Sequence, residues 1–172
     1  MAHELYTRTN QKIFFAGLSL ESWRKAEESR AMNAQALVQS AREASLFHLY
    51  GALLGLCHEI AGYYRLPEAN APRVESLLTQ DVLAAAPSPE LAELVELAQQ
   101  RETWLAELLA AYSALFQPPQ APRQAKVNPT LPLITAVSVE EDAPPLSREC
   151  LESWRQNLKS LALRFRETLS EC

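Results

Sequence analysis

The chain has 172 residues, of which 48% are hydrophobic and 22% charged, and its 16 basic and 21 acidic side chains leave a formal charge of −5. This length and balance allow a buried core and exclude a chain that is disordered throughout. Its three cysteines are odd in number and far apart, which argues against a secreted disulfide framework. The modest acidic balance gives no general affinity for nucleic acid.

The composition predicts helices. Ala and Leu together supply 54 residues, whereas Val and Ile supply ten. Ala and Leu favour helices, and β-branched residues favour strands. Only four glycines are present, which leaves few residues for tight hairpin turns. We therefore expect an all-α fold, an antiparallel bundle with a long central helix.

Apolar periodicity and capping signals predict five helices. In the first, Ile13, Leu20 and Trp23 lie on one face. The fourth begins with Ser88 as a cap and Pro89 at the first helical position, where proline is well tolerated. Wide apolar stripes of this kind bury against other helices. The predicted helices span about 4–28, 31–65, 73–86, 88–116 and 147–170.

Prolines divide the chain unevenly, because seven of the eleven lie between Pro118 and Pro145. Proline cannot continue a helix, so we predict an extended connection over 117–145. Its centre, 131–139, is apolar and is expected to lie in a groove on the body. The whole chain, 1–172, is expected to form one domain, with four helices in 1–116 and a last helix in 146–172.

Helix 31–65 is predicted to be central, and it carries three of the four glycines on one face. Each glycine weakens a helix by up to about 1 kcal/mol relative to alanine. Three glycines on one face therefore indicate a packing or functional requirement at that face. One interpretation is close approach by a neighbouring helix. The other is a small cleft, lined by this face's residues His48, Gly51, Gly55, His58, Glu59 and Gly62.

Nucleic acid is an unlikely partner for this chain, but two basic patterns leave such a contact open. Arg42 and His48 match the loose Arg-x4–6-His spacing of helical nucleases, in which His acts as acid or base and Arg steadies a phosphate. The alternative is an arginine at the core margin and a packed histidine. The last helix carries a basic stripe that could follow a phosphate backbone or form a solvated face with charge pairs. The stripe consists of Arg148, Arg155, Lys159 and Arg166.

Metal and cofactor chemistry is not expected. His48 and His58 are ten residues apart, about 15 Å along a helix, so they cannot share an ion. The chain has no Cys-x-x-Cys pair, no His-Glu-x-x-His, and no glycine-rich phosphate loop. We expect no metal and no cofactor.

Two segments resemble a known group of sequences. They are residues 3–17, HELYTRTNQKIFFAG, and residues 47–64, FHLYGALLGLCHEIAGYY. They are similar to a family of short uncharacterised proteins from pseudomonads and related bacteria, and the resemblance covers most of the chain. It implies a bacterial, cytoplasmic protein of one domain. The family is a domain of unknown function, so the resemblance supplies no activity and no functional residues.

The leading hypothesis is a small interaction or regulatory protein without enzymatic activity, which binds a protein partner or a second copy of itself. The alternatives are a helical ribonuclease-like domain that uses Arg42 and His48, and a carrier of a small apolar ligand with a pocket beside Gly51 and Gly55. No membrane association is expected, since the apolar run 49–57 is about half the ~18 residues needed to cross a bilayer.

Overall fold

The computed structural model describes residues 2–118 and 146–170, with side chains from Glu4 onward, and each described element is a helix. The predicted all-α class is therefore confirmed. Three long helices form one layer: α1 (Ala2–Glu28), α2 (Ala34–Tyr63) and α6 (Arg148–Ser170). The 3-10 turn η1 and three short helices form a second layer over α2: η1 (Val74–Ser76), α3 (Gln80–Ala85), α4 (Pro89–Gln99) and α5 (Trp104–Ala114).

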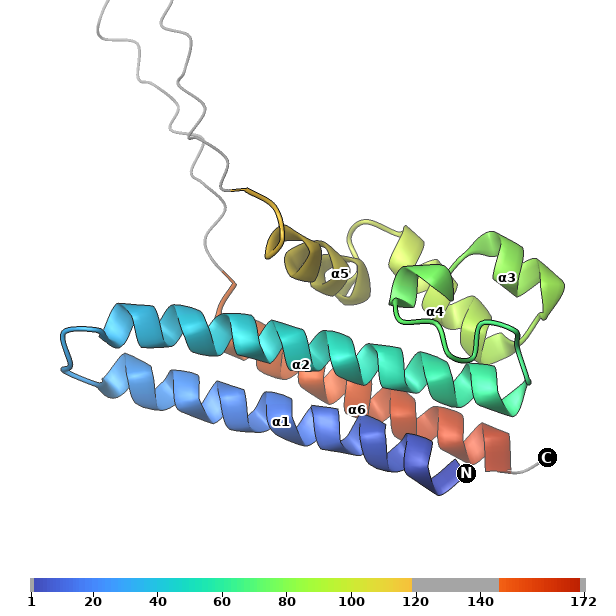
Figure 1. Cartoon of the computed structure of the whole chain (residues 1–172), viewed down its shortest axis with the longest axis horizontal. Coiled ribbons are helices and arrows are strands. Elements are labelled where there is room, and N and C mark those ends of the chain that lie inside the picture. Colours follow the sequence, from blue (N-terminus) through green and yellow to red (C-terminus); the bar gives the residue numbers. More distant parts are fainter. Residues whose placement is uncertain (1, 119–145, 171–172) are drawn as a thin grey trace, which may run out of the picture.

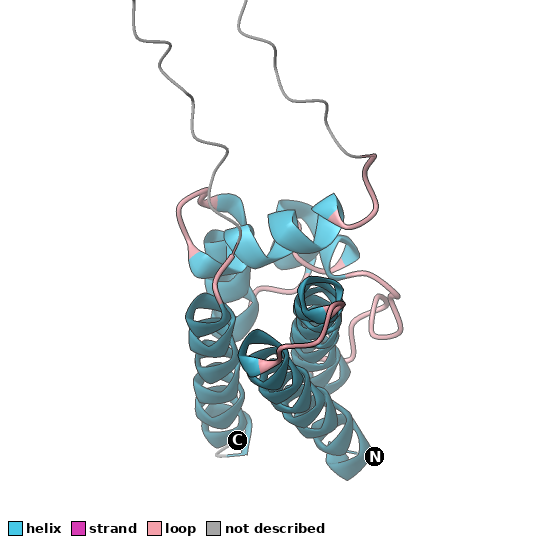
Figure 2. Cartoon of the chain, turned by 90° about the vertical axis from the view of Figure 1, so that its left-hand side faces the viewer, coloured by secondary structure: helices cyan, strands magenta, loops and turns pink. Residues whose placement is uncertain are grey.

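The three long helices lie side by side, as the end-on view in Figure 2 shows. Helix α1 runs antiparallel to α2 and to α6, whereas α2 and α6 run in the same direction (Figure 1). Helix α6 begins near the end of α1, where Arg148 pairs with Glu27 at 3.2 Å.

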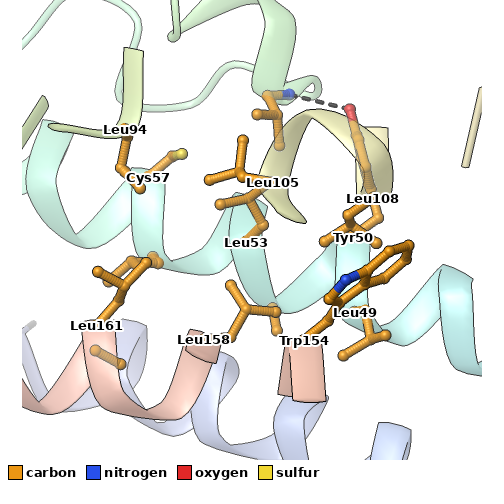
Figure 3. Packing of buried hydrophobic residues seen from close by; sticks show 14 of the residues in the cluster. Leu49, Tyr50, Leu53, Cys57, Leu94, Leu105, Leu108, Trp154, Leu158 and Leu161 are labelled. Atoms are coloured by element: carbon orange, nitrogen blue, oxygen red, sulfur yellow. Dashed lines mark hydrogen bonds between the residues drawn. The ribbon is translucent and has the colours of Figure 1, made fainter. Parts of the chain in front are cut away.

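Helix α2 is central, because α1, α4, α5, α6 and η1 all pack against it. Leu49, Leu53 and Leu56 of α2 are fully buried. In Figure 3 the leucines of α4 and α5 lie on one side of α2, and Trp154 and Leu158 of α6 lie on the other. The three apolar residues of α1 that were predicted to share a face, Ile13, Leu20 and Trp23, are buried, and so is Ala16.

The prediction of one continuous fourth helix is wrong, because the structure has two helices in this range. Helix α4 ends at Gln99, Gln100 adopts an extended backbone, and α5 begins at Trp104. Thr103 caps α5, because its hydroxyl accepts from the Ala106 amide at 3.2 Å. Thr103 also donates to the Leu97 carbonyl, which closes the turn between the two helices.

The predicted helix over 73–86 is also shorter than expected. It consists of the turn η1 and of α3, which Thr79 caps through the Val82 amide at 3.1 Å. The proline-rich segment falls largely outside the described residues, which resume at Leu146.

Candidate functional site

The glycine face of α2 lies against α1. A β-carbon on Gly55 would lie 2.7 Å from Thr9 Oγ1 and 3.3 Å from Thr9 Cα, and one on Gly51 would lie 3.1 Å from Lys12 Cδ. Helix α1 therefore occupies the space beside Gly51 and Gly55 that the predicted cleft would need. The geometry at these two positions is close helix approach, in which glycine lets the helix axes come near each other.

A pocket does open farther along the same face, at the last turn of α2. It has a volume of about 360 Å³ and lies between the beginning of α1, the end of α2 and the segment that follows α2. Three of the predicted cleft residues line it, whereas His48, Gly51 and Gly55 do not. We call it the Gly62 pocket and define it by Leu5, Tyr6, His58, Glu59, Gly62 and Tyr63.

One wall of the Gly62 pocket is a buried ion pair. Glu59 accepts from Arg166 Nε at 2.9 Å and from Nη2 at 2.7 Å, and only 1% of the Glu59 side chain is exposed. Arg166 Nη1 donates to Asn10 Oδ1 at 2.9 Å, and the guanidinium carbon lies 4.6 Å from the centre of the Tyr6 ring. This arrangement joins α1, α2 and α6. No local pattern in the sequence predicts this pair, because 107 residues separate the two charges.

A histidine is fixed beside this wall. His58 Nε2 lies 2.7 Å from the Ala71 carbonyl oxygen. Since a carbonyl can only accept, Nε2 is the donor in this hydrogen bond. His58 and Glu59 therefore both lie at this end of α2, and their neighbours differ from those of a cleft along the whole face.

Most side chains of the predicted basic stripe on α6 form hydrogen bonds or ion pairs within the fold. Arg148 pairs with Glu27 at 3.2 Å, and Arg155 Nε donates to the Ile13 carbonyl at 2.9 Å. The third arginine belongs to the buried ion pair described above. Lys159 is exposed. These arginines fasten α6 to α1 and α2, so they do not form a continuous basic surface for a phosphate backbone.

Arg42 and His48 pack on different aromatic groups. The Arg42 guanidinium lies 4.9 Å from the centre of the Trp23 ring, and its Nε is buried without a hydrogen bond. His48 makes edge contacts with Phe15 and Phe47, each at 5.4 Å between ring centres, and its Nδ1 is also buried without a hydrogen bond. These contacts match those of an arginine at the core margin and a packed histidine.

An exposed aromatic surface surrounds His48. The side chains of Phe14, Leu18 and Phe47 are 59%, 51% and 51% exposed, which is unusual for residues of this size. The rings follow one another across the surface, from Phe14 to Phe15 at 6.5 Å and then to His48 and Phe47. We define the aromatic face as Phe14, Phe15, Leu18, Phe47 and His48.

Basic groups border the aromatic face. Lys12 Nζ lies 5.1 Å from the centre of the Phe47 ring and 6.0 Å from that of Phe15. Partial burial and the nearby Arg8 lower the pKa of Lys12. Partial burial and Lys12 in turn lower the pKa of His48. In the described parts of the chain, no ion pair includes Arg8 or Lys12.

A comparison with known families identifies the family of this chain. Residues 1–172 match DUF6586, a family of unknown function. The chain belongs to this family. The expected membership of a family of unknown function is thereby confirmed. No curated protein and no solved structure matches the chain. Membership of DUF6586 supplies no activity and no site residues.

This DUF6586 chain also contains buried polar groups that sequence reasoning missed. The Tyr50 hydroxyl donates to Glu75 at 2.7 Å and accepts from the Val74 amide at 3.1 Å. This second bond is the dashed line in Figure 3. Burial raises the pKa of the Cys57 thiol to about 12, so it is not a reactive thiolate at neutral pH. We interpret these groups as fold-stabilising.

Two classes of site find no support in the described part of this DUF6586 chain. No group of three or more His, Cys, Asp or Glu side chains converges there on a point that could hold a metal ion. Within residues 2–118 and 146–170, no helix is both long and apolar enough to cross a bilayer.

Proposed function

We propose that this chain is an interaction protein of the bacterial cytoplasm, a single domain without enzymatic activity, whose aromatic face binds an apolar and acidic segment of a partner protein. The observation that carries the proposal is the aromatic face itself, on the outer side of the α1–α2 hairpin. Contiguous exposed apolar surface on a small protein is typical of a binding site. Exposed aromatic side chains at the centre of an interface contribute much of its binding free energy.

Charge favours an acidic partner segment. Arg8 and Lys12 border the aromatic face without an ion pair in the described residues, although the chain as a whole carries a charge of −5. Carboxylates on the partner would balance these two positive charges and would steer its approach. A second copy of this chain, docked through the same face, would instead bring further Arg8 and Lys12 side chains into the interface.

The free thiols of Cys57 and Cys150 support the proposed cytoplasmic location, because the cytoplasm is a reducing compartment. A role in RNA cleavage has less support, because Arg42 and His48 pack on separate aromatic groups. A nuclease site needs these groups to face one phosphate.

The test is a pull-down with the full chain as bait, with and without ribonuclease, read by mass spectrometry. The test variants are Phe14→Ser/Phe47→Ser, which removes the aromatic face, and Lys12→Glu, which reverses its charge. The matched control is Phe116→Ser/Leu163→Ser, because these side chains, just after α5 and on α6, are 72% and 54% exposed. We expect a partner that survives ribonuclease, is lost with both test variants and is retained with the control.

Three outcomes would contradict the proposal. A partner retained equally by all variants would place the interface elsewhere. Loss of every partner on ribonuclease treatment would favour nucleic acid as the ligand. Dimerisation of the purified wild-type chain that Phe14→Ser/Phe47→Ser abolishes, measured by light scattering, would identify a second copy as the occupant.

A further inference from the structure

A groove continues from the aromatic face along the α1–α2 hairpin, toward the loop that joins the two helices. It has a volume of about 530 Å³. On α1, Ser19 follows Phe15 by one helical turn, and on α2, Ala44 precedes His48 by one turn. Residues one turn apart share a helix face, so the groove and the aromatic face belong to the same side of the hairpin. We call it the serine groove and define it by Ser19, Ser22, Ala26, Ser40, Ala41 and Ala44.

Small side chains form most of the serine groove. Apart from Lys25 and Leu37, the lining residues are serines and alanines. Small side chains on two adjacent helices let a third helix come close to both, and leave holes that its larger apolar side chains can fill. From Lys12 to Ser29, the aromatic face and the groove together extend for about 25 Å along α1, the length of a helix of roughly 17 residues.

Other common forms of a bound segment fit this surface less well. An extended segment adds a strand to the free edge of a sheet, whereas α1 and α2 are helices, whose backbone groups pair within each helix. A proline-rich segment docks in a groove lined by aromatic rings, and the lining of the serine groove contains no such ring among the described residues. A helix is the form that matches a long groove between two helices.

The charge of this surface favours an acidic helix. Lys25 is the charged residue of the groove lining, and no described carboxylate lines the groove. Glu21 and Glu28, on the same helix, both pair with Arg24. Glu43 of α2 is exposed and lies outside the lining. Carboxylates on the partner helix would therefore balance Lys25 at one end of the surface and the basic border of the aromatic face at the other.

Given the interaction proposed above, on which this step rests, we propose that the bound partner segment is an acidic amphipathic helix that lies along the α1–α2 hairpin. Its apolar stripe contacts the rings of Phe15 and Phe47 and fills the serine groove. Its acidic residues flank the stripe and face Lys12 and Lys25. A segment bound in another form would need the aromatic face alone, so the two proposals can fail separately.

Fluorescence anisotropy with the full chain and labelled peptides tests the helical form. The first probe is a peptide of about 18 residues, with leucines at helical spacing flanked by glutamates. The second probe has prolines at two central positions, which break the helix, and the third has lysines in place of the glutamates. We expect saturable binding of the first peptide and affinities lower by about tenfold or more for the other two.

Two variants locate the bound peptide. Ser40→Trp fills the serine groove from an exposed position and should weaken binding of the first peptide by about tenfold. Ser160→Trp is the matched control, at an exposed serine of α6, and should leave binding unchanged. Circular dichroism checks that both variants keep their helix content. Equal binding of the proline peptide, equal effects of the two variants, or no saturable binding of the first peptide would each overturn the proposal.

The pull-down described above, repeated with Ser40→Trp, distinguishes failure of the helical form from failure of the proposed function. We expect the partner to be lost with Ser40→Trp as well as with Phe14→Ser/Phe47→Ser. A partner lost with Phe14→Ser/Phe47→Ser but retained with Ser40→Trp would support the aromatic face and overturn the helix along the groove. A partner retained with Phe14→Ser/Phe47→Ser would overturn the proposed function itself.

Discussion

The carboxylate of Glu59 and the guanidinium of Arg166 form a two-bonded ion pair, at 2.7 and 2.9 Å, where α1, α2 and α6 meet. The Glu59 side chain is almost fully buried, and 15% of Arg166 is exposed. A buried pair of this kind adds little net stability compared with apolar residues, but breaking it is costly, because one charge is left without a partner. Its role here is to fix how α6 lies along α2, and so to shape the Gly62 pocket.

Replacement of one partner should therefore destabilise the fold more than replacement of both. We expect Arg166→Met to lower the free energy of unfolding by about 3–5 kcal/mol, since Glu59 stays buried and unpaired. Glu59→Leu/Arg166→Met should recover most of this loss. Urea denaturation followed by circular dichroism measures both variants.

The control for this pair lies two residues away. Arg164 makes an ion pair with Glu93, but the two side chains are 53% and 36% exposed. Arg164→Met should cost about 0–1 kcal/mol, as is typical of surface pairs. Equal losses in Arg164→Met and Arg166→Met would show that burial of the Glu59–Arg166 pair has no special effect.

The close approach of α1 and α2 gives a second prediction. Gly55→Ala places a β-carbon against the Thr9 backbone and hydroxyl, and we expect it to cost about 1–3 kcal/mol despite the better helix propensity of alanine. Gly51→Ala should be close to neutral, because its neighbour is the flexible stem of Lys12. Thermal unfolding of the two variants compares them directly. Thr9→Ala should partly rescue Gly55→Ala by removing the hydroxyl, and a larger loss in Gly51→Ala than in Gly55→Ala would contradict this account.

Local signals in the sequence predicted the helical parts of this fold well. Ser88 caps α4 through the Leu91 amide, at 3.3 Å, and the apolar face of α1 is buried as its spacing required. The break between α4 and α5 was missed, because the apolar spacing continues across it. Its one local signal was Thr103, a good helix cap within the predicted helix.

The candidate site was harder to predict, because its geometry comes from contacts between distant parts of the chain. The three glycines of α2 share one face in sequence, yet α1 covers Gly51 and Gly55 while a pocket opens at Gly62. Helical periodicity cannot tell these cases apart, since the difference lies in where the neighbouring helix crosses. The pairing of Glu59 with Arg166 depends in the same way on how α6 is placed.

The end of α2 provides a third prediction. Arg65 has a φ of 54°, in the left-handed region, and the Leu66 amide donates to the Ala61 carbonyl at 2.9 Å. Glycine is the usual residue at this position, because a side chain there is strained. We expect Arg65→Gly to raise the free energy of unfolding by about 1 kcal/mol. Arg65→Ala keeps the β-carbon and should bring no such gain. Urea denaturation of the two variants distinguishes them, and an equal effect would show that the arginine side chain, not the backbone, sets stability here.

The pH dependence of stability should report on His48. Partial burial and the nearby Lys12 lower the pKa of this ring in the folded chain, while Phe15 and Phe47 enclose it. Below about pH 6.5 the unfolded chain therefore takes up a proton that the folded chain resists, so the free energy of unfolding falls as the pH falls through this window. His48→Leu removes this contribution to the free energy of unfolding. We expect the loss of stability between pH 7 and pH 5, measured by urea denaturation, to be smaller in His48→Leu than in the wild type. A larger loss in the variant would mean that the folded chain stabilises the protonated ring, and the aromatic face would then carry a third positive charge under mildly acidic conditions.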